Sequence, residues 1–227
     1  MKINLGSRGV FSSPLVHLDP GEQFVCEAGA MLRAWSNVEI NVTTKSKGKG
    51  GLLAGVKRLL AGESFFFSTY VAGGGQAGEV GLAPTLQGEI AEIKCDGSCK
   101  WLCTGGSYLA GSTSLEINTQ FQGFKGLFSG ESLSFVEVSG QGSLLISAFG
   151  RITAIPVEGG LTVDTGHVVA FQDSLQYTIS KAGSSFIQSF LAGEGLVMNF
   201  TGRGIIYVQS HNPREFGGMR GPPIPPA

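Results

Sequence analysis

The chain has little charge and no long hydrophobic run. Only 15% of its 227 residues are charged, whereas about 25% is usual in globular proteins. Its 42% apolar share is enough for a sizeable core, which excludes the intrinsically disordered class. The net charge of −1 gives no field that would attract nucleic acid. No stretch approaches the ~18 consecutive apolar residues of a membrane-spanning helix.

Targeting and catalytic signatures are also missing. The N-terminus has no apolar run typical of a signal peptide, so we expect a cytoplasmic protein whose four cysteines are reduced. His17, His167 and His211 are far apart and show no metal-binding or catalytic spacing. No Walker loop, His-Glu-x-x-His or Gly-x-Ser-x-Gly motif occurs. We therefore expect no enzymatic activity, no catalytic residues and no cofactor.

Glycine, by contrast, is abundant, and the sequence repeats itself. The 36 glycines are roughly twice the average share of ~7% and fit many tight turns between short strands. One six-residue pattern occurs three times, at 60–65, 128–133 and 191–196. A second pattern, beginning at Gly29, Gly106 and Gly166, precedes each copy. The chain is therefore predicted to hold three copies of one supersecondary unit, at about 1–95, 96–158 and 159–211.

The repeats have the pattern of β-structure. Segments 133–138, 166–171 and 204–208 are short, rich in β-branched and aromatic residues, and bounded by glycine; the last is typical of a strand buried on both faces. Asp96-Gly97 and Gly159-Gly160 predict two-residue hairpin turns at the repeat boundaries. We therefore predict an all-β, pseudo-threefold sandwich or barrel-like body over residues 1–211.

Two segments depart from the strand pattern. Apolar residues recur at helical spacing between Leu52 and Leu60, which predicts one short amphipathic helix. Five of the nine prolines lie in the last fifteen residues, so residues 212–227 are predicted to be a disordered or polyproline-like tail.

These motifs resemble those of a known family. The segments that carry the resemblance are 50–53, 58–66, 78–84 and 101–110. They are similar to a family whose eukaryotic members are named for altered inheritance of mitochondria, and this chain resembles a bacterial member. The resemblance implies a fold like that of the tryptophan RNA-binding attenuation protein, repeated within one chain. It also implies a role linked to membrane organisation, without catalytic residues to carry over.

Two motifs have a structural interpretation that we favour. Cys95, Cys99 and Cys103 are spaced by three residues, and Cys26 is distant. The Asp96-Gly97 turn should direct Cys95 and Cys99 to opposite faces, so small buried cysteines are favoured over a zinc site. Residues 73–78 match Gly-x-Gly-x-x-Gly, but this motif leaves one predicted strand and enters another. A hairpin loop is therefore favoured over a dinucleotide site, which requires a following helix.

Glu63, Glu131 and Glu194 occupy equivalent positions in the three repeats. On a pseudo-threefold axis they would form a ring of carboxylates that could bind a cation or an amine. The alternative, which we favour, is that each carboxylate accepts backbone N–H bonds in its own turn.

A basic segment provides the other candidate site. It contains five of the sixteen basic residues, namely Lys45, Lys47, Lys49, Lys57 and Arg58. A solvated loop, a contact with a protein partner or an anionic membrane surface, and nucleic-acid binding all fit such a cluster. The absence of interleaved aromatic residues argues against nucleic acid.

The leading hypothesis is a non-enzymatic scaffold or binding protein that engages a protein partner or a membrane surface through residues 45–60. The alternative is a small-ligand or metal-ion binder that uses the repeated glutamates. Exposed sheet edges would also allow a homo-oligomer.

Overall fold

The computed structural model of the chain describes residues 1–6, 11–43, 67–118, 134–181 and 196–213. Within these ranges the structure is almost entirely β, with one short 3₁₀ helix, η1 (Thr165–His167). The sixteen strands are β1 (Lys2–Asn4), β2 (Leu15–Leu18), β3 (Gln23–Glu27), β4 (Met31–Ala34), β5 (Val38–Thr43), β6 (Phe67–Ala72), β7 (Gly78–Leu82), β8 (Ile90–Asp96), β9 (Trp101–Thr104), β10 (Tyr108–Ser112), β11 (Leu115–Asn118), β12 (Phe135–Ser147), β13 (Ile152–Asp164), β14 (Val168–Gln172), β15 (Gln176–Lys181) and β16 (Leu196–Gln209). The predicted all-β fold is confirmed.

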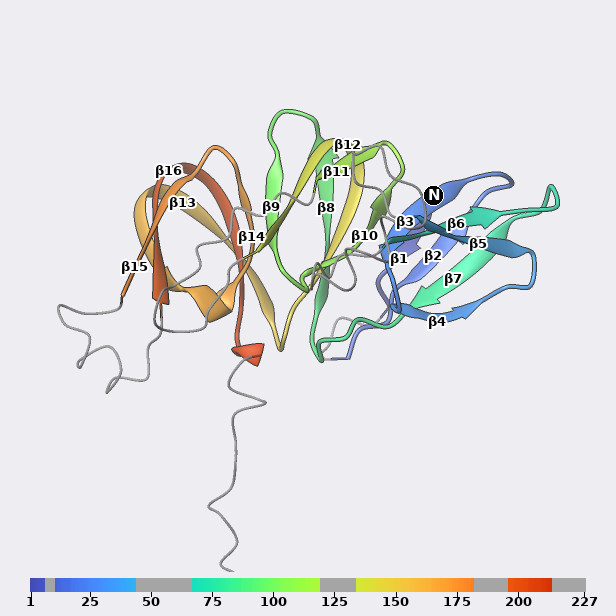
Figure 1. Cartoon of the computed structure of the whole chain (residues 1–227), viewed down its shortest axis with the longest axis horizontal. Coiled ribbons are helices and arrows are strands. Elements are labelled where there is room, and N and C mark those ends of the chain that lie inside the picture. Colours follow the sequence, from blue (N-terminus) through green and yellow to red (C-terminus); the bar gives the residue numbers. More distant parts are fainter. Residues whose placement is uncertain (7–10, 44–66, 119–133, 182–195, 214–227) are drawn as a thin grey trace, which may run out of the picture.

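The strands form three groups with the same pairing scheme, which follow one another across the molecule (Figure 1). In the third group, the long strand β16 pairs with β13, β14 and β15. In the second group, β12 pairs in the same way with β8 and β9, β10, and β11. In the first group the long strand is divided: β6 pairs with β3 and β5, and β7 pairs with β2 and β4. The chain therefore holds three copies of one antiparallel unit, β1–β7, β8–β12 and β13–β16. The predicted repeat boundaries fall inside two of these copies, because residue 96 ends β8 of the second copy and residue 159 lies within β13 of the third.

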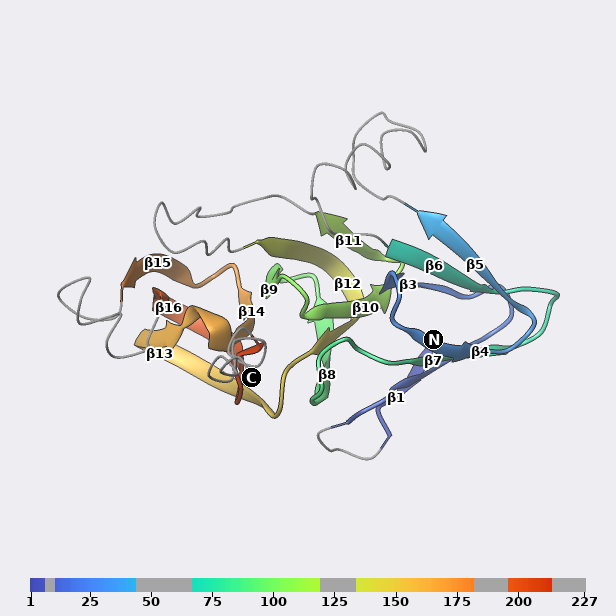
Figure 2. The same ribbon diagram turned by 60° about the horizontal axis from the view of Figure 1, so that its bottom comes forward.

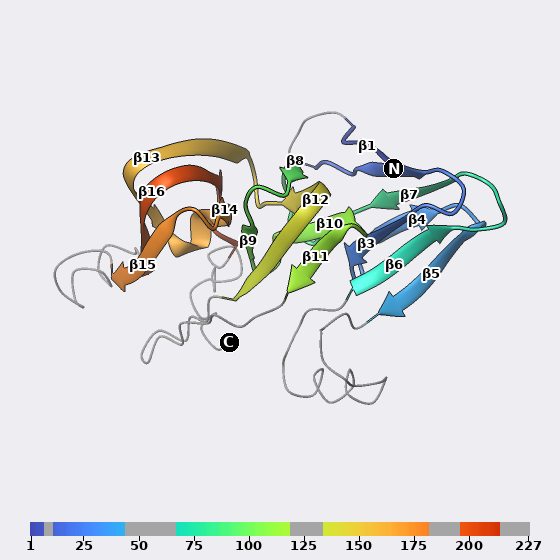
Figure 3. The same cartoon turned by 90° about the horizontal axis from the view of Figure 1, so that it is seen from above.

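Neighbouring groups are joined by strand pairing. β10 of the second group pairs antiparallel with β3 of the first, and β14 of the third group pairs antiparallel with β9 of the second. The result is a twelve-stranded sheet that runs through all three groups, and a four-stranded sheet in the order β1-β2-β7-β4. Figures 2 and 3 show the first and third groups on either side of the second.

Each group carries a β-bulge at the same place. The register shifts at the second residue of the strand that follows the shared glycine motif. The shifts fall between Met31 and Arg33 in β4, between Tyr108 and Ala110 in β10, and between Val168 and Ala170 in β14. Arg33, Ala110 and Ala170 are therefore equivalent positions, each four residues after its motif glycine.

Three hydrophobic clusters fill the groups. The first contains Phe24 stacked on Tyr70, with ring centroids 5.0 Å apart. The second surrounds Trp101 and Cys103, and the third holds Phe171 against Phe200 at 5.1 Å. Such aromatic pairs add stability beyond the burial of their area. Each cluster is centred on one group but also includes residues of a neighbouring group, such as Leu109 in the first cluster and Phe135 in the third.

The predicted hairpins at Asp96-Gly97 and Gly159-Gly160 are wrong. β8 and β9 both pair with β12 in the same direction, so residues 97–100 interrupt one strand path instead of reversing it. β13 runs through Gly159, which faces Gly202 of β16, and both glycines have positive φ (112° and 102°). Glycines with positive φ are common in hairpin turns, but here they lie within long strands. The dipeptide pattern does not distinguish these two positions.

Two other predictions need correction. Residues 73–77 do join two strands, as predicted, but β6 and β7 lie in different sheets and the loop is not a paired hairpin. The run 204–208 is not buried on both faces, because Ile205 is 36% exposed. The predicted helix at 52–60 and residues 214–227 of the predicted tail lie outside the described residues.

Candidate functional site at the open strand edges

The residues predicted to bind a ligand or partner lie outside the described parts of the chain. These residues are Lys45, Lys47, Lys49, Lys57, Arg58, Glu63, Glu131 and Glu194. The basic-segment and glutamate-ring hypotheses therefore stay predictions. The candidate site described below comes from the strand arrangement.

β4 presents an apolar outer edge. It pairs with β7 on one side, and no other described strand pairs with it. Met31 and Leu32 of this strand are 40% and 59% exposed, and Trp35, which follows it, is 55% exposed. Large exposed apolar side chains on an unpaired strand edge are typical of a protein-binding surface.

The equivalent positions in the other two groups are buried. Leu109 of β10 and Val169 of β14 occupy the bulge position of Leu32, and both are 0% exposed. They are covered where β10 pairs with β3 and β14 pairs with β9. Leu32 is exposed because, among the described residues, no strand equivalent to β3 or β9 lies beside β4. The difference lies in the neighbours and not in the residue type.

A second open edge lies in the third group. β3 and β9 each pair with a bulged strand of the next group. Their equivalent is the C-terminal half of β13, because Cys26, Cys103 and Thr162 face equivalent residues of the long strands. Among the described strands this half of β13 pairs only with β16, and Gly160 and Thr162 are exposed.

Charged side chains connect β4 to the neighbouring strands of its sheet. The Arg33 guanidinium lies 2.6 Å from one Glu79 carboxylate oxygen, and His17 Nδ1 lies 3.1 Å from the other. The three residues come from β4, β7 and β2, and partly exposed ion pairs of this kind contribute little to stability. The contacts instead orient the Arg33 side chain, while the outer backbone edge of β4 stays available.

Buried polar contacts close the junction between the second and third groups. The Thr104 hydroxyl donates to the carbonyl oxygens of Val168 and Val169 at 2.8 and 3.1 Å. The Ser107 hydroxyl contacts the same Val169 oxygen at 2.7 Å. These bonds satisfy carbonyls at the bulge, where the regular ladder is interrupted.

The junction between the first and second groups, where β3 pairs with β10, has a carboxyl group where the junction between the second and third groups has a hydroxyl group. Glu27 follows Cys26 in β3 as Thr104 follows Cys103 in β9. Burial raises the Glu27 pKa from 4.5 to about 7. The Tyr108 hydroxyl donates to the Val25 carbonyl at 3.3 Å across this junction. The stability of the junction is therefore coupled to pH through Glu27.

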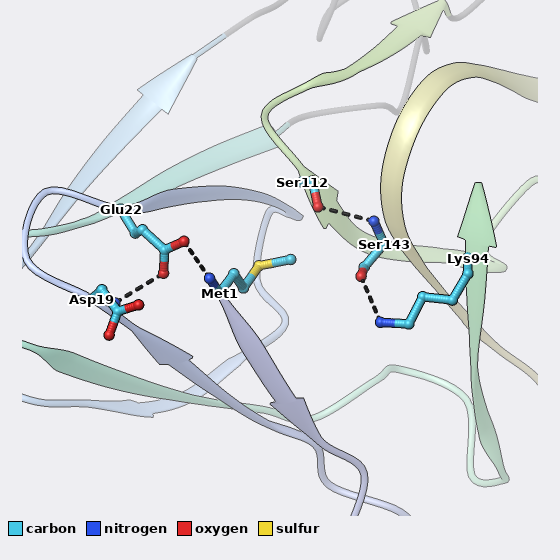
Figure 4. Close-up of polar contacts among 6 residues, drawn as sticks. All are labelled: Met1, Asp19, Glu22, Lys94, Ser112 and Ser143. Atoms are coloured by element: carbon cyan, nitrogen blue, oxygen red, sulfur yellow. Dashed lines mark hydrogen bonds and ion pairs between the residues drawn. The ribbon is translucent and has the colours of Figure 1, made fainter. Parts of the chain in front are cut away.

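Further polar contacts fix the first group and the middle strands (Figure 4). Glu22 binds the N-terminal ammonium group of Met1 and accepts the Asp19 backbone N–H at 2.9 Å. The Ser112 hydroxyl, at the end of β10, accepts the Ser143 backbone N–H at 3.0 Å. Both sets of contacts serve strand positioning.

The cysteines do not form a metal site in the described structure. Cys95 and Cys103 are buried in one hydrophobic cluster and Cys99 packs against it, so the prediction that Cys95 and Cys99 point to opposite faces is wrong. The missing hairpin removes the basis for that prediction. Burial raises the Cys95 pKa to about 11 and that of Cys103 further, which opposes thiolate formation. Within the described ranges, no three His, Cys, Asp or Glu residues are placed to hold a metal ion.

No helix in the described part of the chain is long and apolar enough to cross a membrane.

The sequence repeats held a signal for the β4 edge that a search for charged clusters does not detect. Trp35 aligns with Ser112 and Gln172, so the first repeat has an aromatic residue where the other two have polar ones. A comparison of apolar residues between the repeats would have found this difference. The unequal burial of equivalent positions, by contrast, requires the three-dimensional strand order.

Comparison with known proteins places these features in a family. The family model described as mitochondrial biogenesis AIM24 matches residues 8–211. An uncharacterized protein of Streptococcus pyogenes serotype M6 is 36% identical over 214 residues, which cover 90% of this chain and 84% of the relative. The crystal structure of a protein from Streptococcus pyogenes is similar with a TM-score of 0.78 and 30% identity, and the match covers 96% of each chain.

Proposed function

Because this chain belongs to the AIM24 mitochondrial biogenesis family, whose matched streptococcal relative is uncharacterized, we propose its function from the strand edges. It acts as a non-enzymatic scaffold that binds a protein partner through the outer edge of β4. The observation that carries this proposal is the exposure of Met31, Leu32 and Trp35 beside a strand edge that no described strand pairs with.

A protein partner fits this edge better than a small molecule. An unpaired strand offers backbone N–H and C=O groups in a row, and an added strand of the partner satisfies them. The apolar side chains provide buried area, and an aromatic residue such as Trp35 is typical of the centre of an interface.

The test is site-specific photo-crosslinking in living cells. p-Benzoylphenylalanine replaces Leu32, and the matched control replaces Ile40, a 45% exposed apolar residue on the edge strand β5. We expect protein adducts at position 32 and few or none at position 40. Equal adducts at the two positions, or none at position 32, would overturn the proposal. Adducts to lipid alone would replace it with membrane-surface binding.

A further inference from the structure

Each internal junction pairs two kinds of strand edge, and one edge of each kind has no neighbour among the described strands. Each internal junction joins a bulged strand of one group to the equivalent of β3 in the group before it. The first group has a bulged strand, β4, without such a neighbour among the described strands. The third group has the matching half-strand of β13, whose outer edge is likewise open within the described ranges.

We infer that β4 of one chain pairs antiparallel with the C-terminal half of β13 in a second copy. This inference rests on the proposed function of β4 as a protein-binding edge and names its partner. It continues the interface that already joins the groups within the chain. The second copy therefore supplies the strand that β3 and β9 supply at the internal junctions.

The internal junctions also give the register. Ala110 faces Cys26 in the first junction, and Ala170 faces Cys103 in the second. The equivalent residues at the open edges are Arg33 and Thr162. Arg33 should therefore face Thr162 of the second copy, and the next two pairs are Ala34 with Leu161 and Trp35 with Gly160.

Side-chain sizes fit this register. The last pair of each internal junction combines an aromatic residue with a smaller one, Phe24 with Ser112 and Trp101 with Gln172. In the inferred junction the aromatic residue is Trp35 and the small one is Gly160. A Cβ atom built on Gly160 would have no neighbour within 4 Å, so no described atom crowds that side of the residue. The exchange of large and small residues keeps the pair complementary.

The two edges cannot be paired within one chain in this arrangement, because β4 and β13 belong to the outer groups and the second group lies between them (Figures 1 and 3). Pairing between chains uses different surfaces on the two copies. Such a heterologous contact produces a closed ring or an open chain of copies, depending on the rotation between them.

The test mixes two variants of the full chain, each with one added cysteine on a Cys99→Ser background, because Cys99 is partly exposed whereas Cys26, Cys95 and Cys103 are buried. Arg33→Cys and Thr162→Cys, one of them tagged to change its size, are combined under mild oxidation. Directly opposed residues on antiparallel strands lie close enough for a disulfide. We expect a mixed disulfide between the two variants, removed by reductant, and much weaker products from either variant alone or from the unsubstituted chain.

A further substitution, at an exposed position where folding should be undisturbed, tests the same interface. Leu32→Lys places a charge on the inferred interface at an exposed position, and Ile40→Lys is its matched control. In the mixing experiment Leu32→Lys, added to both partners, should reduce the mixed disulfide at least tenfold, whereas Ile40→Lys should leave it unchanged.

Other outcomes overturn the inference in distinguishable ways. Disulfides between two copies of the Arg33→Cys variant, without the other variant, would show symmetric β4–β4 pairing. In a chain that carries both Arg33→Cys and Thr162→Cys, a disulfide confined to single chains would show closure within one chain. No mixed disulfide, together with photo-adducts of another protein at position 32, would reject self-pairing and leave the proposed function intact. Absence of both products would reject both proposals.

Discussion

Leu109 and Leu32 occupy the same position in two copies of one structural unit, and their truncation should have unequal costs. Leu109 is 0% exposed, and Leu109→Ala removes three carbons worth about 0.8 kcal/mol each in transfer free energy. With the cavity that remains, the free energy of unfolding should fall by about 3–4 kcal/mol. Leu32 is 59% exposed, so Leu32→Ala should cost about 1 kcal/mol or less in the isolated chain.

Urea unfolding, monitored by Trp101 fluorescence, measures both values. Trp101 is 4% exposed. The chain has two tryptophans, so all variants are made in a Trp35→Phe background in which Trp101 is the only one. The measurement is made at low protein concentration, because self-association would stabilise the folded state by mass action. A cost for Leu32→Ala equal to that for Leu109→Ala would refute the unequal burial. So would a cost for Leu109→Ala below about 0.5 kcal/mol, the usual range of surface substitutions.

Two further predictions concern titratable groups. The folded-state pKa of Glu27 is raised from 4.5 to about 7 by burial, so its stabilising contribution is complete below pH 4.5 and is lost as the pH rises through about 7. Glu27→Gln should therefore stabilise the chain relative to the parent more at pH 8 than at pH 5. The gain in free energy of unfolding should be about 1–2 kcal/mol larger at pH 8, after allowance for partial solvent screening, in denaturation curves of both proteins at both pH values. A pH-independent difference between variant and parent would contradict this. Ellman's reagent should modify the partly buried Cys99 first, and Cys26, Cys95 and Cys103 only as the chain unfolds, because burial raises the pKa of each of these three thiols. Two or more rapidly reacting thiols in the native protein would exclude this order.

The sequence repeats predicted the β class and the threefold repetition because both depend on local patterns. Glycine-bounded runs of β-branched residues mark strands wherever they occur. The family resemblance, based on segments such as 101–110, was confirmed by the family model over residues 8–211. The presence of strands and the number of repeats therefore follow from the amino-acid sequence alone.

Strand direction does not follow from local patterns. Asp96-Gly97 forms a local turn, in which the Asp96 carboxylate accepts the Ser98 backbone N–H at 2.9 Å. Whether such a turn reverses the chain depends on which strand lies beside it, and here β12 pairs with both flanking strands. Long-range pairing with a strand some forty residues away overrides the dipeptide preference.

The β4 edge could not be predicted from residue type, because Leu32 and Leu109 are the same residue in different surroundings. Their burial depends on whether another group lies beside the bulged strand. That is a property of how many groups the chain contains and in which order they pair.

Sedimentation velocity across a concentration series tests self-pairing most directly. We predict that the unsubstituted chain sediments as multiples of one chain at high concentration, and that Leu32→Lys sediments as a single chain while Ile40→Lys behaves like the parent. A single-chain mass for the parent at every concentration would contradict self-pairing. The same would follow if Leu32→Lys associated as the parent does.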